Sequence, residues 1–237
     1  MSFPPANAPA NALGTRGLLC QRGSLAVRAG ELDFARGTLH LLRGEPASGH
    51  ELLLRVLGLL ELPESGEVFV EAAGTRELGD DARLKLRERR LGFVFSAPFL
   101  LPAFTVIENI AMPLFKISDV EPPEARRRSE VVLELTGLTE LSEMLCTDLG
   151  PLGQHRAALA RAIVNEPAAV LVESLDAALI EDDLRAFTAL LRLAANQLGI
   201  AVVASVSAAF LPAPGDRVIE VVDGLAIASE LSPRSAT

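Results

Sequence analysis

The sequence predicts an α/β fold in which a mostly parallel sheet is covered by helices on both faces. Continuous apolar runs such as Leu39–Leu42 and Ala168–Val172 have the length of strands that are buried on both faces. These runs alternate with longer segments of helical periodicity, which is the order expected of a parallel sheet with crossover helices. The 237 residues, 49% of them hydrophobic, are enough to bury such a core. An antiparallel β subdomain near the N-terminus and an inserted helical subdomain complete the predicted fold.

The central feature is a strand, a loop of small residues and an apolar helix. Gly44 and Gly49 are separated by four residues, which is the spacing of a phosphate-binding P-loop. Such a loop points successive backbone N–H groups and a helix N-terminus at one anion. The Lys and Ser/Thr that normally complete it are replaced by His50 and Glu51. The sequence therefore predicts a P-loop NTPase-type fold with a vestigial nucleotide-binding loop. That loop consists of Gly44, Glu45, Ala47, Ser48, Gly49, His50 and Glu51.

The N-terminal half contains short elements around this loop. Residues 1–15 are rich in Ala, Pro and Asn and lack the pattern of a signal peptide, so we expect a flexible tail. Short apolar runs from Gly17 to Gly37 predict small antiparallel strands. Glu51–Leu60 should form the helix after the loop, and Glu67–Glu71 alternates like a strand. The basic segment Arg83–Arg90 predicts a helix with a solvated face.

Helical spacing dominates the middle of the chain, where we place a helical subdomain at about residues 97–157. Pro122 opens a helix that should end near Gly137. Helices are also expected at Gln154–Val164 and Glu181–Leu198. Buried strands are expected at Leu91–Phe95, Ala168–Val172 and Ile200–Ala204, with a final hairpin at Val218–Asp223 and Gly224–Ala228. The whole domain should span residues 16–228, followed by a tail at 229–237.

Several motifs occur in one order and at normal spacing. They are Phe93–Phe95 with Leu100–Pro102, then Thr105–Ile110, Gln154–Pro167 and Asp216–Gly224. On these motifs the chain resembles the nucleotide-binding subunit of ATP-binding cassette transporters over about residues 17–228. The run Leu100–Leu114 is similar to the branch that includes lipoprotein-release and macrolide-export ATPases. The resemblance implies a P-loop ATPase that binds ATP and Mg²⁺.

The residues at the family's chemical positions are nevertheless substituted. The resemblance places the Q-loop Gln at Ser96, the catalytic Glu at Ser174 and the switch His at Val206. Ser174 is a poor base at neutral pH, and Val206 can neither donate nor accept a proton. The magnesium-binding Asp falls on Glu173, which is therefore the candidate metal ligand; shifting the alignment by one residue would instead make Glu173 the base. The signature motif falls on Leu149, Gly150, Pro151, Leu152 and Gly153.

The loop substitutions also change the expected binding of ATP and Mg²⁺. A histidine is mostly neutral at pH 7, so His50 does not replace the charge of the lysine. Glu51 places a negative charge close to the expected position of the β-phosphate or of Mg²⁺. Two interpretations stay open. The Glu51 carboxylate can be the anion at the helix N-terminus, or Glu51 or Glu173 can bind Mg²⁺.

An apolar cluster indicates a partner. It consists of Phe95, Phe99, Leu100, Leu101, Pro102 and Phe104. These residues can fill the core of the helical subdomain, or they can dock on a permease in the region where family members receive its coupling helix. The resemblance also implies pairing with a second cassette, as a homodimer or a heterodimer. Gly150, Pro151 and Leu152 would weaken the partner's nucleotide site, because they remove a hydroxyl and an N–H group and add bulk.

Composition limits the remaining functions. The net charge of −9 argues against a nucleic-acid partner. No apolar run reaches the roughly 18 residues of a membrane-spanning helix. Cys20 and Cys146 are expected to be buried free thiols in a reducing compartment rather than a disulfide. The resulting hypothesis is a degenerate cassette subunit, peripheral on the cytoplasmic face of a bacterial inner membrane, with weak or absent ATP hydrolysis. The alternatives are an active ATPase with unusual motif residues and a soluble pseudoenzyme interaction module.

Overall fold

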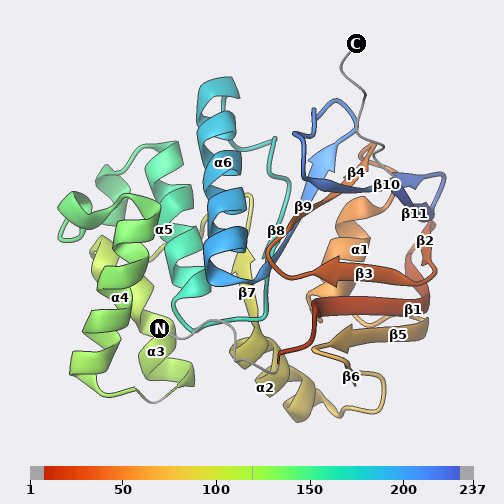
Figure 1. Ribbon diagram of the computed structural model, residues 1–237, viewed down its shortest axis with the longest axis horizontal. Helices are drawn as coiled ribbons and strands as arrows, with labels where there is room; N and C mark the ends of the chain where they lie inside the picture. Colours follow the sequence, from red (N-terminus) through yellow and green to blue (C-terminus); the bar gives the residue numbers. More distant parts are fainter. Residues whose placement is uncertain (1–7, 119, 230–237) are drawn as a thin grey trace.

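The computed structural model describes residues 8–118 and 120–229, and within them the strands form one mixed sheet flanked by helices (Figure 1). The strand order is β6-β5-β1-β2-β11-β10-β4-β9-β8-β7, and β3 pairs with β1. The strands are β1 (Asn11–Arg22), β2 (Leu25–Ala29), β3 (Leu32–Ala35), β4 (Leu39–Gly44), β5 (Ser65–Val70), β6 (Ala73–Gly74), β7 (Leu91–Val94), β8 (Ala169–Val172), β9 (Ala201–Ser207), β10 (Arg217–Val222) and β11 (Leu225–Ser229).

The sheet has two parts that differ in strand direction. Strands β10, β4, β9, β8 and β7 are parallel neighbours. Strand β1 pairs antiparallel with β2, β3 and β5, which forms the predicted antiparallel subdomain. The C-terminal hairpin joins the two parts, because β10 pairs with β4 while β11 pairs with β2. The predicted fold class is confirmed.

Helices cover both faces of the sheet. They are α1 (His50–Leu57), α2 (Asp80–Arg90), α3 (Val106–Ile117), α4 (Pro122–Thr136), α5 (Pro151–Ile163) and α6 (Glu181–Leu198). Side chains of β4 alternate between two cores: Leu41 packs with the cluster under α3 to α6, and Leu42 packs with the cluster under α1. Burial on both faces explains why this strand reads as a continuous apolar run. Figure 1 shows α3, α4 and α5 gathered at one side of the sheet.

Most predicted elements are present, with shifted ends. Helix α6 and the end of α4 at Gly137 are confirmed. Helix α5 begins three residues earlier than predicted, at Pro151, because proline is well suited to the first turn, where its missing N–H would have no helical partner. Helix α1 ends at Leu57 rather than Leu60, since Gly58 forms its C-cap.

The predicted N-terminal tail is wrong for its last residues. Asn11–Thr15 belong to β1, where they pair with β3 and β5, and Leu13 is buried. The composition of this segment did not reveal these pairings, because they depend on strands far along the sequence. The predicted C-terminal tail likewise loses Ser229 to β11. Residues 1–7 and 230–237 of the two predicted tails lie outside the described residues.

Both cysteines are buried and free, as predicted. Burial raises the pKa of the Cys20 thiol to about 11 and also raises the pKa of the Cys146 thiol. Both thiols are therefore protonated and unreactive at neutral pH.

Candidate functional site

The predicted site residues meet at one edge of the sheet. The carboxyl ends of parallel strands lie on the same side, so the segments that follow β4, β7, β8 and β9 are neighbours. The vestigial nucleotide-binding loop, Gly44–Glu51, is called the phosphate loop below, and it follows β4. Ser96 follows β7, and Glu173 follows β8. The fold therefore brings together three of the positions that the sequence pattern singled out.

The phosphate loop has the backbone of a P-loop. Gly49 precedes α1 with a φ of 89°, a conformation that residues with a Cβ rarely adopt. A Cβ on Gly44 would lie 2.2 Å from the Oγ of Ser48 and 2.8 Å from the main-chain oxygen of Val221. The N–H of Ser48 donates to the carbonyl of Glu45 at 2.8 Å. Both glycines are thus required by the tight course of the loop.

His50, which the resemblance places at the position of the P-loop lysine, is turned into the protein. Its side chain is 4% exposed, and its Nδ1 lies 3.0 Å from the Oγ of Ser48. Burial lowers the pKa of His50, although the neighbouring Glu51 acts in the opposite direction. The imidazole is therefore neutral at pH 7, and the loop carries no fixed positive charge at this position.

Glu51, the last residue of the phosphate loop, lies in the first turn of α1. Its carboxylate accepts a hydrogen bond from the Oγ of Ser174 at 2.5 Å, which links α1 to the segment after β8. The N–H of Ser174 in turn donates to the Oγ of Ser205 at 2.8 Å. Over the described part of the chain, no loop N–H donates to the Glu51 carboxylate. That Glu51 is the anion at the N-terminus of its own helix stays a prediction: the residue lies in the first turn of α1, and its carboxylate is also bonded to Ser174.

Glu173 faces a different part of α1. Its Oε1 lies 3.5 Å from Nη1 of Arg55, and the Oγ of Ser96 donates to its Oε2 at 3.5 Å. Arg55 also donates from Nε to Glu61 at 2.6 Å. Residues 8–118 and 120–229 contain no group of three His, Cys, Asp or Glu side chains that could hold a metal ion. Glu51 and Glu173 are thus engaged by separate protein partners.

The signature positions lie at the start of α5. Gly150 is the N-cap and Pro151 is the first helical residue, while Leu149 is buried and Leu152 packs against the core. The carbonyl of Leu149 accepts from Nε2 of Gln154 at 3.0 Å. Gly153, the last of the five positions, lies within the first turn of α5.

The remaining candidates divide between packing and exposure. Val206 is fully buried in β9. His40 and His155 are packing residues, because they contact the rings of Phe34 and Phe187 at centroid distances of 5.2 Å and 5.7 Å. In the apolar cluster, Phe95 and Leu100 are partly buried, whereas Phe99, Leu101, Pro102 and Phe104 are exposed.

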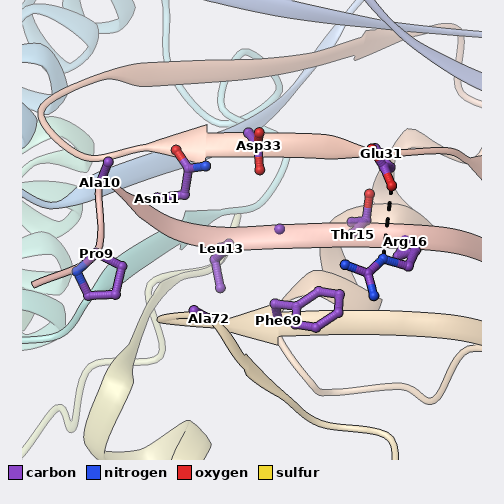
Figure 2. Close-up of a pocket in the computed structure, with 11 residues that line it drawn as sticks. Pro9, Ala10, Asn11, Leu13, Thr15, Arg16, Glu31, Asp33, Phe69 and Ala72 are labelled. Atoms are coloured by element: carbon purple, nitrogen blue, oxygen red, sulfur yellow. Dashed lines mark ion pairs between the residues drawn. The ribbon is translucent and has the colours of Figure 1, made fainter.

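A separate pocket of about 400 Å³ lies on β1, β3 and β5 (Figure 2). Arg16 lies over the ring of Phe69 at 4.9 Å, and its Nε is 3.9 Å from the carboxylate of Glu31. None of the candidate site residues that were predicted from the sequence lines this pocket, so the pocket is distinct from the phosphate-loop site.

The imidazoles of His40 and His50 are expected to titrate at lower pH than histidine in an unfolded peptide. Burial lowers the pKa of His40 to about 4 and also lowers the pKa of His50. Because the unfolded chain binds these protons more strongly, the free energy of unfolding should fall as the pH decreases below about 6.5. Proton NMR, with each histidine assigned by substitution with Gln, measures the midpoints. A midpoint for His50 at or above that of the unfolded chain would contradict the buried imidazole.

The fold and the loop define a P-loop NTPase cassette. The sequence profile described as "ABC transporter" matches residues 27–174. The chain is 39% identical over 152 residues to the lipoprotein-releasing system ATP-binding protein LolD of Hyphomonas neptunium, an alignment that covers 64% of this chain and 66% of the relative. It is 33% identical over 199 residues to the protein of the same name from Shewanella denitrificans, covering 84% of this chain and 85% of the relative. The chain belongs to the ABC transporter family.

Solved structures of ATP-binding cassettes match the fold of this chain. The ATP-binding cassette MJ0796, described as a dimer in a post-hydrolysis state bound to ADP and Pi, matches with a TM-score of 0.72 and 26% identity, covering 90% of this chain and 96% of that one. CbiO1 from Clostridium perfringens, at 21% identity and a TM-score of 0.83, has the same fold and covers 92% of this chain and 88% of that one. The predicted likeness to the lipoprotein-release branch is also confirmed. The alignments to the first three relatives span 64–66% of their length, which is just under two thirds.

Helices long and apolar enough to cross a membrane are absent from residues 8–118 and 120–229.

Proposed function

We propose that this chain is a degenerate cassette subunit of a bacterial membrane transport complex, which docks on a permease and hydrolyses ATP weakly or not at all. The arrangement of the phosphate loop carries the proposal. The neutral His50 is held by Ser48, and Glu51 is hydrogen-bonded to Ser174. The loop therefore keeps its backbone but presents a carboxylate, instead of an ammonium and a hydroxyl, beside the place of a triphosphate.

The residues present do not fit a magnesium–triphosphate complex. A hard cation needs several oxygen ligands, and Mg²⁺ usually takes one or two carboxylates together with substrate phosphates. Glu173 is paired with Arg55, and Glu51 is bonded to a different partner. At the catalytic position, the Ser174 hydroxyl donates to a carboxylate and cannot act as a base toward water. The neutral imidazole of His50 also provides no fixed positive charge, which further disfavours binding of the triphosphate.

The docking function is supported by the exposed apolar residues that follow β7. Phe99, Leu101 and Phe104 are 69%, 37% and 39% exposed. Exposed apolar residues that cluster on one loop are typical of interaction surfaces. We place the chain on the cytoplasmic face of the inner membrane, paired with itself or with another cassette. Its similarity to the lipoprotein-release branch of the ABC transporter family suggests a complex that handles lipids or lipoproteins.

Two measurements on the purified chain test the proposal. Titration calorimetry with Mg-ATP should give no binding in the micromolar range, and turnover should stay at the level of a buffer blank. An active cassette such as MJ0796 provides the positive control. A micromolar dissociation constant together with steady release of phosphate would support the alternative, an active ATPase with unusual motif residues.

Affinity purification from detergent-solubilised membranes tests the partner. We expect an integral membrane protein with several spanning helices to be recovered in a fixed ratio to the chain, as identified by mass spectrometry. Recovery of the chain alone, or of soluble proteins only, would favour the soluble interaction module instead.

A further inference from the structure

We infer that Arg161 and Asn109 are positioning residues that hold residues 98–104, the docking loop, so that Phe99 projects as a preformed anchor for an apolar pocket of a membrane-protein helix. This inference rests on the proposed docking function and names the residues that prepare the surface for it. Neither Arg161 nor Asn109 was identified as a functional residue from the sequence, since each acts through main-chain contacts of the loop, which the sequence pattern does not reveal.

Arg161 fixes the first half of the docking loop to a rigid helix. It lies on α5, and its guanidinium donates from Nη1 to the carbonyl of Phe99 at 2.8 Å and from Nη2 to the carbonyl of Pro98 at 2.7 Å. Two parallel bonds from one planar guanidinium define the orientation of both peptide groups. The turn is therefore attached to α5 across 62 residues of sequence.

Phe99 has an unusual backbone conformation in this turn. Its φ is 47°, in the left-handed region that bulky residues rarely adopt. Its ring contacts Phe95 edge to face at a centroid distance of 5.7 Å, and Phe95 stacks on Phe93 at 5.8 Å. The ring is supported at its base by this row of aromatic side chains, yet 69% of the residue is exposed. The strained turn thus presents a large apolar group to the outside.

Asn109 fixes the second half of the docking loop. Its side chain is buried, its Oδ1 accepts from the N–H of Leu101 at 2.7 Å, and its Nδ2 shares its two N–H groups among the carbonyls of Leu101, Phe104 and Thr105, which lie at 3.0–3.2 Å. A capping box between Thr105 and Glu108 fixes the start of α3 directly after it. Both ends of the docking loop are therefore anchored to helices. An ordered loop loses less conformational entropy when a partner binds, which favours tight association.

The chemistry of the surface indicates its partner. Residues 96–104 contain no charged side chain, in a chain in which 22% of the residues are charged. A groove of about 520 Å³ continues from Phe104 along α3; it is lined by Ile107, Ala111, Met112 and Phe115, and the charged residues Glu108, Lys116 and Arg126 also border it. An apolar segment of a helical membrane protein matches the uncharged docking loop, and aromatic anchors such as Phe99 commonly contribute most to such contacts.

The chain offers a direct reporter for the position of residue 99. It contains no Trp and no Tyr, so Phe99→Trp introduces one fluorophore that selective excitation can follow. We expect emission typical of an exposed indole, with the high anisotropy of an ordered side chain. Adding Arg161→Gln should lower this anisotropy, and Arg161→Lys should restore it only in part, because an ammonium cannot bind both carbonyls in the same plane.

The matched control is Arg156→Gln, which changes the same residue type on the same helix without touching the docking loop. It should leave the anisotropy unchanged even if it lowers the melting temperature. If Arg161→Gln and Arg156→Gln have the same effect on anisotropy, the positioning role of Arg161 is overturned. The same comparison with Asn109→Ala tests the other end of the loop.

Binding supplies the second part of the test. The Phe99→Ala variant should retain at least tenfold less of the membrane protein recovered with the unmodified chain. The amount retained by the Arg161→Gln variant should lie between the amounts retained by these two proteins. Undiminished retention by Phe99→Ala would overturn the anchor. If the unmodified chain recovers no membrane protein, the docking function and the anchor both fail, whereas the anisotropy measurement still decides whether the loop is preformed.

Discussion

The double substitution His50→Lys with Glu51→Ser is expected to raise the affinity for Mg-ATP about 100-fold, the equivalent of about 2.7 kcal/mol. Lysine restores a fixed positive charge beside the loop, and serine removes the carboxylate that opposes the phosphates. Two like charges about 4 Å apart repel by roughly 4 kcal/mol at an effective dielectric constant near 20. Since Glu51 is exposed, solvent screening leaves only part of this gain. Titration calorimetry measures the change.

The control for this prediction is Glu45→Ser. It also removes an exposed carboxylate from the loop, but it leaves His50 and Glu51 in place, so the affinity should change little. Turnover should remain absent in the double variant, because Ser174 and Val206 still provide no general base and no group to position water. An unchanged affinity in the double variant would mean that the loop is closed to nucleotide for another reason.

The substitution Arg192→Ala is expected to destabilise the fold by about 3 kcal/mol, because it leaves a buried carboxylate without its cation. Asp216 is 3% exposed and accepts from Nε and Nη2 of Arg192, both at 2.8 Å. Its remaining contact is with the N–H of Ala213 at 2.8 Å. This pair ties α6 to the segment before β10. Denaturant unfolding followed by far-UV circular dichroism gives the free energy.

Arg185→Ala is the matched control on the same helix. Arg185 pairs with Asp182, but their side chains are 70% and 82% exposed. Exposed pairs of this kind contribute about 0–1 kcal/mol, so the loss should be small. Equal effects of the two substitutions would show that burial of Asp216 does not determine the stability of the pair.

The sequence predicts the elements whose signals are local. Buried parallel strands such as β4 and β8 are continuous apolar runs, and the glycine spacing of the phosphate loop indicates its backbone. The sequence does not predict the partners of the loop's side chains. Glu51 bonds to Ser174, 123 residues away, a contact that a local rule for helix N-termini does not predict. The start of β1 was missed for the same reason, because its pairing depends on distant strands.

Arg161 and Asn109, which hold the docking loop, illustrate another limit of prediction from the sequence. Arg161 lies in an alanine-rich helix whose pattern indicates helix formation but not the direction of a single side chain. Its role becomes visible only through two carbonyl contacts. Strain at Phe99 is equally invisible in the sequence, because a left-handed conformation is expected of Gly or Asn rather than Phe.

The hairpin of β10 and β11 has a consequence for synthesis of the protein. These strands, Arg217–Ser229, lie between β2 and β4 and connect the antiparallel and parallel parts of the sheet. In a ribosome-bound nascent chain the two parts can pack on their shared core early, but their strands are not hydrogen-bonded into one sheet until this segment emerges from the exit tunnel. Premature termination before Arg217 would release a polypeptide with two unpaired strand edges, which are templates for aggregation.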